Sequence, residues 1–435
     1  MQDGGGFNNV DSVRLKELRE SKQRCARRFG EAKRQGEDLT ALKAEMQSIT
    51  QEVDELEGRL RGMQKSEHDR PTPSAQEHVP QRFVYRPPDT SAPSGLRIAV
   101  ASDDAAWDIY AAAHPSASPY HFATWRRLVC GVMGHEDASI EARTAEGRIV
   151  GILPLIHMKS RLFGRFLVSM PYFNYGGPLA DSRGIDNALL AEGAAAVARL
   201  GVQHAEIREM HARASLPCRD NKVSMVRSLP QTDAELDRQL GSKLRAQVQR
   251  ARREAHELRI GGQELLDDFY AVFARNMRDL GTPVYAKQLF SAVLEAWPER
   301  SRIVVLSLGG RPVAAGFLVG HADVLEIPWA STLRSVNHMG VNMLLYRSIL
   351  AHAIEGGYRW FDFGRSTEDA STFRFKKQWG AEPVRHHWHY CLPEGASLPG
   401  LNPDNPKFRM LIAAWQRLPV WVTRVIGPVV VRGIP

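Results

Sequence analysis

The sequence predicts a mixed α/β (α+β) protein preceded by an antiparallel helical hairpin, and three observations lead to this fold class. Apolar residues recur at three- and four-residue spacing through residues 13–65, as they do in packed helices. Residues 66–95 are rich in Pro, Ser and Thr and lack periodicity, which is typical of a linker. Beyond Leu96, short apolar runs with Gly-containing turns alternate with helical patterns.

The length and composition are those of a globular protein with more than one domain. At 435 residues, with 43% hydrophobic and 24% charged residues, the chain can bury more than one core. We predict a disordered segment, a coiled-coil hairpin, a linker, two α/β domains and an amphipathic tail, in that order, at residues 1–12, 13–65, 66–95, 96–230, 231–393 and 394–435.

Charge and cysteine usage limit the partners and the compartment. A net charge of +8 favours an acidic partner such as RNA, a phosphorylated substrate or an anionic membrane face. The four cysteines lie far apart without metal-ligand spacing, which indicates free thiols in a reducing compartment. No signal-peptide pattern and no apolar run of membrane-spanning length is visible. We expect a cytoplasmic protein, with peripheral contact at the inner-membrane face left open.

The two helices of the N-terminal hairpin carry opposite charge. A turn at residues 35–38 separates a basic first helix from an acidic second helix, whose apolar seam continues over residues 39–63. Opposite charges allow the helices to pair and still leave basic residues near the tip. A homodimer formed through this coiled coil is an open alternative.

The first α/β domain should contain a meander followed by a helix and a further strand. Helical patterns occupy residues 107–113, 123–133 and 189–200. Strands are expected at residues 98–100, 138–144, 149–158 and 204–208.

The second α/β domain repeats this mixture. Helices are expected at residues 242–258, 265–280, 286–297 and 342–353. Strands are expected at residues 303–308, 313–319 and 323–330. The helix at 242–258 is basic, which suits either contact with phosphate or RNA or simple solvation.

An aromatic strand near residue 360 is the most informative stretch. Residues 358–366, YRWFDFGRS, alternate bulky and polar side chains around Asp362. Residues 373–380, FRFKKQWG, follow with two adjacent lysines. A carboxylate at the end of a buried strand can orient a substrate or take up a proton, and a lysine can stabilise developing negative charge. The competing interpretation of Asp362 is a structural ion pair with a neighbouring arginine.

Several motifs together resemble the FemAB (Fem/Mur ligase-like) branch of the acetyltransferase (GNAT) superfamily, especially its members associated with exosortase/PEP-CTERM exopolysaccharide systems. The matching stretches are YFNYGGP at 172–178, GGRPVAAG at 309–316, FDFGRS at 361–366 and FRFKKQWGA at 373–381. The resemblance covers residues 96–435. It implies tandem GNAT-like domains and the activity of an acyltransferase.

The resemblance also assigns the catalytic lysine. Lys376 follows Phe375 where the Fem family has its Phe-Lys pair, and there the lysine is implicated in stabilising charge near the ester oxygens. Phe375 is accordingly expected at the substrate, and Lys377 is the substitute for Lys376.

Further substrate contacts are expected around these residues. Arg365 could hold a phosphate or carboxylate through two hydrogen bonds. Tyr175 and Asn174 lie in the matching loop and could contact the acceptor, although a purely structural role for that loop is equally open.

The acyl donor is inferred from a departure from the GNAT pattern. Acetyltransferases usually carry a Gln/Arg-x-x-Gly-x-Gly/Ala loop whose amides hold the pyrophosphate of coenzyme A at a helix N-terminus. Residues 334–342 keep a single Gly of that loop. The mismatch disfavours coenzyme A and fits the FemAB branch, whose donor is an aminoacyl-tRNA, so no bound cofactor is expected. An acyl-coenzyme A thioester is the alternative donor.

The N-terminal hairpin resembles the arm with which seryl-tRNA synthetase grips the long variable arm of its tRNA, especially over residues 29–38. The basic residues expected to contact RNA are Arg24, Arg27, Arg28, Lys33 and Arg34. A plain dimerising coiled coil explains the same pattern.

Two further features have competing interpretations. The tail mixes apolar residues with arginines, so it either lies on a membrane surface or packs on the body. His386, His387 and His389 are close in sequence, but a strand would alternate their side chains, and we expect no metal site.

Three functions follow. The first is the transfer of an amino acid from tRNA to an amine on a cell-envelope or exopolysaccharide precursor. The second is a coenzyme A-dependent acyltransferase that modifies an exopolysaccharide. The third is a non-catalytic GNAT-derived scaffold whose hairpin recruits assembly partners.

Overall fold

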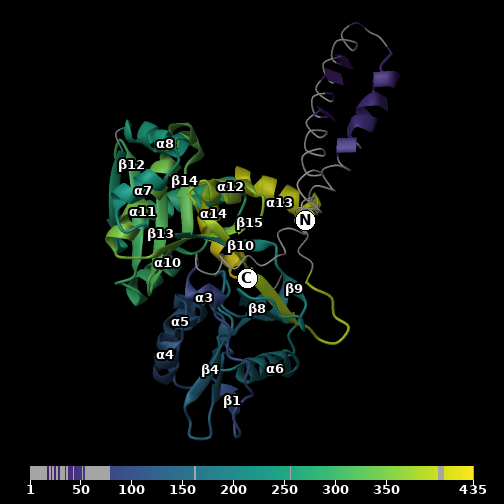
Figure 1. Ribbon diagram of the computed structural model, residues 1–435, viewed down its shortest axis with the longest axis vertical. Coiled ribbons are helices and arrows are strands. Elements are labelled where there is room, and N and C mark those ends of the chain that lie inside the picture. The colour runs from purple at the N-terminus through teal and green to yellow at the C-terminus, as the bar shows by residue number, and fades with distance from the viewer. Residues whose placement is uncertain are drawn as a thin grey trace, which may run out of the picture. The chain divides into compact units, whose positions relative to one another are not determined.

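The computed structural model describes residues 79–160, 163–254, 256–399 and 406–434, together with isolated positions between residues 17 and 53. The chain divides into two compact units, Met1–Glu77 and His78–Pro435. We call the second unit the body. It contains a first lobe, built on a four-stranded and a six-stranded sheet, and a second lobe, built on a seven-stranded sheet (Figure 1).

The described positions of the N-terminal unit pair in an antiparallel direction. Leu18 and Val53 form a small buried cluster with Ile49 beside them. The thiol of Cys25 donates a hydrogen bond to the carbonyl of Leu42 at 3.7 Å. Residue 18 therefore lies beside residue 53, and the later residue 25 lies beside the earlier residue 42. This order of contacts is that of two antiparallel helices.

The second lobe is a sheet with the strand order β11-β12-β13-β14-β15-β10-β16. Neighbouring strands are antiparallel except β14 and β15, which run parallel and are connected through helix α11 (Val341–Glu355). The strands are β10 (Lys222–Ser228), β11 (His256–Gly261), β12 (Ser301–Leu308), β13 (Arg311–His321), β14 (Val324–Thr332), β15 (Trp360–Thr367) and β16 (Glu382–Arg385).

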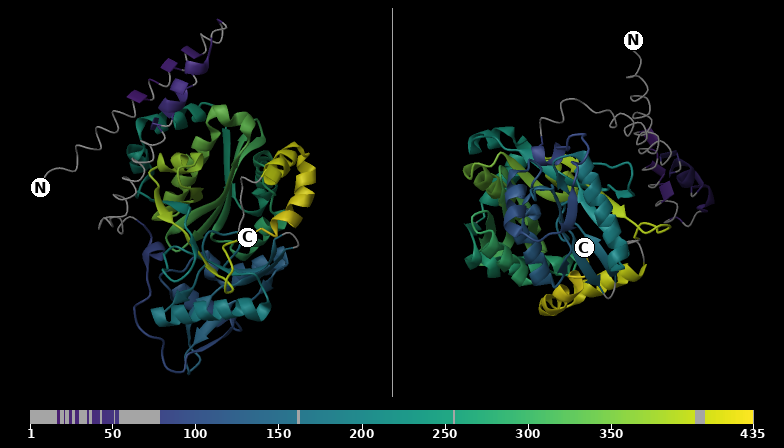
Figure 2. Two further views of the ribbon diagram at one scale, coloured as in Figure 1. Left: turned by 90° about the vertical axis from the view of Figure 1, so that its right-hand side faces the viewer. Right: turned by 90° about the horizontal axis from the view of Figure 1, so that it is seen from below.

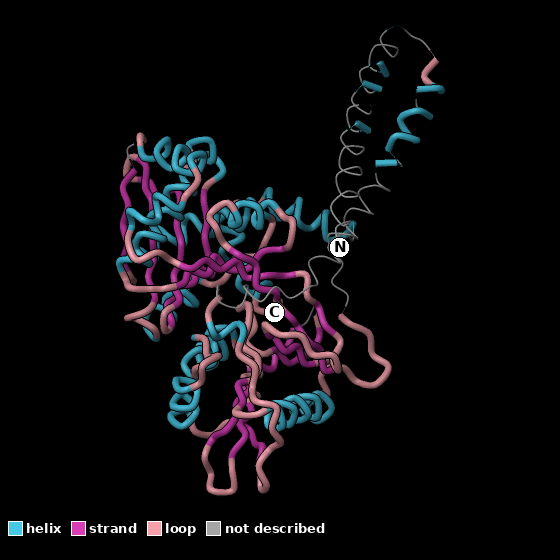
Figure 3. The backbone as a smooth tube through the Cα atoms, viewed as in Figure 1, coloured by secondary structure: helices cyan, strands magenta, loops and turns pink. Residues whose placement is uncertain are grey.

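Helices cover both faces of this sheet, as Figure 3 shows. One face packs against α9 and α10 through side chains such as Phe269, Phe290 and Phe317. The other face packs against α7, α8 and α11, and α12 follows β15. These helices are α7 (Asp233–Gln239), α8 (Ser242–Arg252), α9 (Leu266–Leu280), α10 (Lys287–Ala296) and α12 (Ser371–Lys377).

Helix α8 is shorter than the sequence predicts. The pattern indicated a helix to residue 258, but α8 ends at Arg252 and residues 256–261 form the edge strand β11. Pairing with β12 stabilises this strand, and such a non-local partner leaves no trace in a helical pattern.

The first lobe contains sheets of order β1-β3-β4-β7 and β2-β5-β6-β8-β17-β9. Its strands are β1 (Arg97–Val100), β2 (Glu136–Asp137), β3 (Ile140–Arg143), β4 (Ile149–Leu153), β5 (Ile156–Ser160), β6 (Gly164–Val168), β7 (Leu179–Ala180), β8 (Ala205–Glu209), β9 (Cys218–Arg219) and β17 (His387–Cys391). Its helices are α4 (Asp104–Ala113), η2 (Pro119–His121), α5 (Ala123–Met133) and α6 (Arg183–Leu200). The single strand expected at 149–158 is divided at Pro154 into β4 and β5, which belong to different sheets.

The two lobes repeat one topology. In the first lobe, helix α6 precedes strand β8, which runs parallel to β6. In the second lobe, α11 precedes β15, which runs parallel to β14. The body is therefore a tandem of related α/β units, as predicted.

Two strands cross between the lobes. β10 comes before residue 230 but lies in the second-lobe sheet, between β15 and β16. β17 comes before residue 393 but pairs with β8 of the first lobe. The domain boundaries expected at 230 and 393 therefore do not coincide with the lobes. Pairing between strands that are distant in the chain is invisible to local patterns.

The segment that we call the strap, residues 80–92, packs on the body although it was expected to belong to a linker. Helix α3 (Gln81–Val84) buries Phe83 in the core. The amides of Arg183 and Gly184 donate to the carbonyls of Pro88 and Thr90 at 2.8 and 3.0 Å. A Pro-rich stretch without periodicity can thus be fixed by partners far along the chain.

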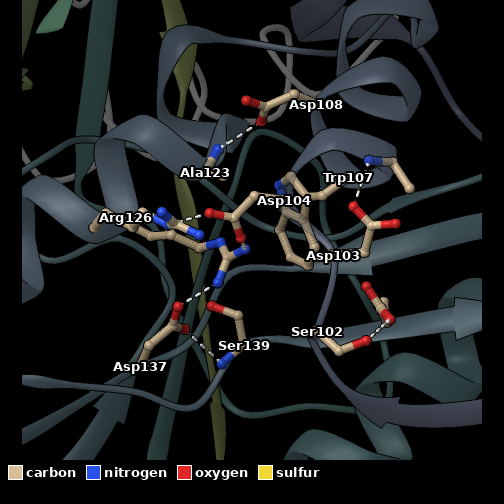
Figure 4. A network of polar contacts seen from close by, with 12 residues as sticks. Ser102, Asp103, Asp104, Trp107, Asp108, Ala123, Arg126, Asp137 and Ser139 are labelled. Atoms are coloured by element: carbon tan, nitrogen blue, oxygen red, sulfur yellow. Dashed lines mark hydrogen bonds and ion pairs between the residues drawn. The ribbon is translucent and has the colours of Figure 1, made fainter.

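Helices α4 and α5 of the first lobe are joined by a network around Arg126 (Figure 4). The buried guanidinium group pairs with Asp104 and Asp137 and lies 4.4 Å from the centre of the Trp107 ring. The indole nitrogen of Trp107 donates to the carbonyl of His121 at 2.6 Å. This network fixes the position of the short helix η2.

The C-terminal residues form α13 (Pro406–Arg417) and α14 (Val420–Val431), drawn in yellow at one edge of the body (Figure 2). The buried residues Thr423, Gly427 and Val431 share one side of α14. One face of α14 thus packs on the body, which is one of the two placements considered for the tail. Within the described ranges, no helix is both long enough and apolar enough to cross a bilayer.

Candidate active site

In the second lobe, the two parallel strands β14 and β15 separate after a short paired stretch. We call the place where they separate the fork. β14 and β15 pair over only three residues each, although both strands continue beyond the last pair. That last pair joins Glu326 and Asp362, which are 1% and 0% exposed. Burial of two neighbouring carboxyl groups is costly, and such pairs are concentrated at functional sites. The fork is therefore the candidate active site.

A β-bulge at Gly364 accompanies the divergence of the strands. Its φ of +74° is a conformation that favours glycine, and a Cβ atom there would lie 3.1 Å from the carbonyl oxygen of Ile327. The pairing of β15 with β10 shifts at this point, between Ser224 and Val226. The amide of Gly364 donates to Oδ1 of Asp362 at 2.8 Å. The bulge thus opens the fork and orients one carboxyl group.

The first lobe and the strap close the fork. The hydroxyl groups of Tyr120 and Tyr175 both donate to Oε2 of Glu326, at 2.8 and 3.1 Å. Arg82 of the strap donates through Nη2 to the hydroxyl oxygen of Tyr175 at 2.7 Å. Tyr120 lies on η2, the helix that the Arg126 network fixes. Two tyrosines from separate segments therefore bond to one carboxyl oxygen, and Arg82 reaches it through Tyr175.

Burial makes the two carboxyl groups basic. Loss of hydration and the neighbouring Asp362 raise the pKa of Glu326 to about 7. Loss of hydration also raises the pKa of Asp362, against the opposing effects of Arg82 and the amide of Gly364. In the described part of the chain, Oε1 of Glu326 and Oδ2 of Asp362 have no hydrogen-bond partner. These oxygens can accept protons from a bound substrate.

Lys376 lies beside this pair, on α12. Its ammonium group donates to the carbonyl oxygens of Gly364 and Arg365 at 3.0 and 2.9 Å, and the residue is 7% exposed. Burial lowers the pKa of Lys376 to about 8, although the charge of Asp362 opposes the shift. The structure therefore brings the two residues predicted to be catalytic, Lys376 and Asp362, into one buried site.

Arg365 lies where the two lobes meet. Its guanidinium carbon is 5.3 Å from the centre of the Trp388 ring, and that of Arg208, from the first lobe, is 4.3 Å from the same ring. The Arg365 side chain is exposed, yet loss of hydration and the charge of Arg208 lower its pKa. Two positive charges thus lie on one ring where the lobes meet, and the role of Arg365 in holding a phosphate or carboxylate stays a prediction.

The remaining predicted site residues are divided between the site and the core. Tyr175 belongs to the fork, whereas Asn174 contributes its main-chain carbonyl, which accepts from the indole nitrogen of Trp388 at 3.1 Å. Phe375 packs on Tyr346 with ring centres 5.1 Å apart, away from Lys376. Adjacent helix positions point about 100° apart, so Phe375 and Lys376 have different surroundings.

Lys377 points away from the fork. Its side chain is exposed, and the ammonium group lies 5.9 Å from the centre of the Phe373 ring. The structure thus places Lys376, and not Lys377, at the carboxyl pair.

A pocket in the first lobe shares residues with the fork. Its volume is about 50 Å³, and Arg82 and Tyr175 form part of its wall. Its other polar lining includes His121, Asp186, Arg208, Glu209 and His211.

The loop at the position of the coenzyme A loop of acetyltransferases, which the sequence matches poorly, is a 3₁₀ helix, η4 (Arg334–Met339), followed by α11. Helix α8 lies against this loop, and Arg250 of α8 donates a hydrogen bond to the main-chain carbonyl of His338 at 3.1 Å. A Cβ atom added at Gly340 would lie 3.8 Å from Ala251. Atoms of α8 therefore occupy one side of the N-terminus of α11.

The predicted RNA-binding residues are only partly within the described positions. Arg24 and Arg28 are exposed, and Arg28 pairs with Glu45 at 3.2 Å. Arg27, Lys33 and Arg34 lie outside the described residues.

The three neighbouring histidines have separate partners, and Nδ1 of His387 lies 3.9 Å from Sγ of Cys218. Nε2 of His386 lies 3.0 Å from Oγ of Ser224, and Nε2 of His389 lies 3.1 Å from the carbonyl oxygen of His211. Among the residues that the structure describes, no group of His, Cys, Asp or Glu side chains is arranged to hold a metal ion.

Sequence reasoning missed Glu326, Tyr120 and Arg82. A signal existed for Glu326, because it is the one charged residue between Val324 and Ala330 in the predicted strand at 323–330. No local signal existed for Tyr120 or Arg82, whose roles depend on contacts between distant segments.

Comparison with known proteins agrees with this fold. Residues 242–377 match the family model for the acetyltransferase (GNAT) domain. Among solved structures, the chain is similar to FemX, with 12% identity, a TM-score of 0.52, and coverage of 73% of this chain and 100% of FemX. The second lobe thus carries an acetyltransferase (GNAT) domain, and the predicted acyltransferase class is confirmed at that level.

Two further solved structures give lower scores. The chain is similar to the C-terminal domain of a putative lysylphosphatidylglycerol synthetase from Agrobacterium fabrum, with 13% identity, a TM-score of 0.45, and coverage of 62% and 87%. L-PGS from Bacillus licheniformis gives 15% identity, a TM-score of 0.43, and coverage of 69% and 91%. No curated protein matches the chain in sequence.

Proposed function

We propose that this protein is a FemAB-like acyltransferase that moves an aminoacyl group from tRNA to an amine on a cell-envelope or exopolysaccharide precursor. The observation that carries the proposal is the buried pair of Glu326 and Asp362 at the fork of an acetyltransferase (GNAT) domain. The FemX-like fold supports it.

The chemistry begins with the acceptor amine, which must lose its proton to form an amide bond. Glu326 is the general base, because its unpartnered Oε1 can accept the proton and its pKa of about 7 matches working pH. The amine nitrogen bonds to the ester carbonyl carbon of the donor, and the bond to the tRNA oxygen breaks. Glu326 then returns the proton to that oxygen, so the carboxylate is regenerated.

Lys376 supplies positive charge during this step. The ammonium group is held by two carbonyl oxygens beside Asp362, so it is fixed before the substrate arrives. A fixed charge in a buried site stabilises the developing oxyanion without reorganisation. Asp362 keeps Lys376 charged and orients it.

Two features support tRNA as the donor. The flank of the α11 N-terminus is covered by α8, and the loop before it keeps one Gly of the usual pyrophosphate-binding pattern. The exposed Arg24 and Arg28, in the hairpin that resembles a tRNA-binding arm, and the net charge of +8 suit a polyanionic partner.

A coenzyme A-dependent acyltransferase is the second candidate. The match of residues 242–377 to the acetyltransferase (GNAT) domain favours it. It uses the same fork and the same base, and differs only in the donor.

Donor binding distinguishes the two candidates. We expect purified full-length protein to shift labelled, charged tRNA in a salt-sensitive way, and deletion of residues 1–65 to weaken the shift. Retention on a coenzyme A resin without affinity for tRNA would replace the first candidate with the second. An Arg24→Glu and Arg28→Glu double variant sharpens the test, with Arg127→Glu and Arg311→Glu as an equal charge change on the body.

A further inference from the structure

Helix α14 has two opposite apolar sides. Thr423, Gly427 and Val431, spaced four residues apart, form its buried side. Trp421, Val425 and Val429 repeat the same spacing two residues earlier, and are 71%, 68% and 70% exposed. An offset of two positions corresponds to about 200° around a helix, so these two rows face opposite directions. We call the second row the α14 stripe.

The α14 stripe is not needed to hold the helix on the body. On the buried side, a Cβ atom added at Gly427 would lie 2.9 Å from backbone and side-chain atoms of Val284. At the two ends of the helix, Arg278 donates to the carbonyl of Leu418 at 3.1 Å, and Tyr172 donates to the carbonyl of Arg432 at 2.8 Å. These contacts fix α14 and leave the stripe unpartnered within the described body.

The exposed apolar surface is concentrated in this tail. α13 adds Met410 and Leu411, which are 73% and 65% exposed. Over the described ranges, most of the large apolar side chains that remain exposed lie on these two helices. A concentration of this kind marks a surface that meets an apolar partner.

The charge of the tail identifies the partner. Residues 405–435 contain no Asp or Glu, and their basic residues are Lys407, Arg409, Arg417, Arg424 and Arg432. Of these, Arg417, Arg424 and Arg432 are exposed. A second copy of the chain would bring equal positive charges together, which opposes self-association through this face. An anionic lipid surface accepts both the cations and the apolar side chains.

We propose that α14 lies on the surface of an anionic membrane and inserts Trp421, Val425 and Val429 into the boundary between headgroups and acyl chains. Tryptophan favours this boundary because its ring is apolar and its N–H group is polar. The arginines contact the lipid phosphates. The body would thereby be held beside a membrane without a spanning segment, whichever acyl donor it uses.

Sedimentation of the full-length protein with lipid vesicles tests the proposal. We expect wild-type protein to sediment with vesicles of phosphatidylcholine mixed with phosphatidylglycerol, and not with vesicles of phosphatidylcholine alone. The bound fraction should fall as the salt concentration rises. A Trp421→Glu and Val425→Glu double variant should lower the bound fraction about tenfold or more. Ile109→Glu is the matched control, because Ile109 on α4 is 72% exposed and lies outside the tail.

Thermal unfolding checks that the double variant folds, and sedimentation velocity without lipid reports self-association. The substituted residues are exposed, so we expect the melting temperature to match that of wild type. Equal binding of the double variant and wild type would overturn the proposal, as would absence of wild-type binding. Loss of a dimer in the double variant, without any vesicle binding by wild type, would assign the stripe to a second copy instead.

Discussion

The two lobes share a pair of parallel strands, but they differ at the last pairing position. In the first lobe, β6 and β8 end their pairing with Val168 opposite Glu206. In the second lobe, β14 and β15 end theirs with Glu326 opposite Asp362. One topology therefore places a single buried acid at one fork and two at the other.

The partners of these acids explain the difference. Glu206 accepts from Nε of the buried Arg208 at 2.7 Å and from the hydroxyl of Tyr390 at 2.7 Å. Among the described residues, Glu326 accepts only from tyrosine hydroxyls, and Arg82 bonds to Tyr175 instead of the carboxyl group. The first fork thus contains a neutralised ion pair, which stabilises structure. The second keeps its acids basic, which costs stability and serves proton transfer.

The largest expected effect is that of Glu326→Gln. Removal of the general base should lower the rate of acyl transfer by a factor on the order of 1,000. The control is Glu141→Gln, because Glu141 is equally buried but pairs with Arg143 at 2.8 Å in the first lobe. Single-turnover transfer assays with the donor found by the binding experiment measure both. Equal losses in the two variants would remove Glu326 from the mechanism.

Lys376→Ala should follow, with a loss of transfer by a factor on the order of 100. The buried charge stabilises the oxyanion, so the rate constant should fall while circular dichroism stays that of the folded protein. Lys377→Ala is the neighbouring control, because that side chain is exposed and points away from the fork. Turnover near wild type in Lys376→Ala would exclude the role assigned to this lysine.

Glu206→Gln probes the other fork and should act on stability. It leaves the guanidinium of Arg208 buried without its carboxylate, so the free energy of unfolding should fall by about 3 kcal/mol. Transfer by the folded fraction should change less than about threefold, because Glu206 is not in the fork of the second lobe. Denaturant titration and transfer assays separate the two quantities. A selective loss of transfer would show that both forks take part in chemistry.

Arg82→Gln should have the smallest effect. The positive charge of Arg82 lowers the pKa of Glu326, against the larger effect of burial. Its loss should move the rising limb of the pH–rate profile to higher pH, by about one unit or less. Arg86→Gln, in the same strap but outside the network around Glu326, should leave the limb in place. A shift toward lower pH would contradict the assigned geometry.

The fold class was accessible from the sequence because most elements carry their own local pattern. The helices at 123–133 and 265–280 and the strands at 303–308 and 313–319 lie close to their predicted positions. The exchange of β10 and β17 between the lobes was not accessible, since it depends on pairing between distant segments. The edge strand β11 was taken for the end of a helix for the same reason.

Only the part of the site formed by the aromatic strand and the helix after it could be predicted from the sequence. Asp362 and Lys376 lie close together in the chain and were predicted together, and the structure brings them together. Glu326 becomes a partner of Asp362 only through a parallel crossover, and Tyr120 and Arg82 reach it from other segments. Phe375 packs on Tyr346, and its contact with the substrate stays a prediction, because a shared motif does not decide which side of a helix faces the ligand.

The pH dependence of single-turnover transfer tests the central claim most directly. Glu326 acts as the unprotonated base, so its raised pKa of about 7 should make the rate fall tenfold per pH unit below that value. Lys376 acts as the charged form, so its lowered pKa of about 8 should make the rate fall above that value. We predict a narrow bell-shaped profile whose rising limb disappears in Glu326→Gln and persists in Glu206→Gln. A rising limb that survives in Glu326→Gln would contradict the account.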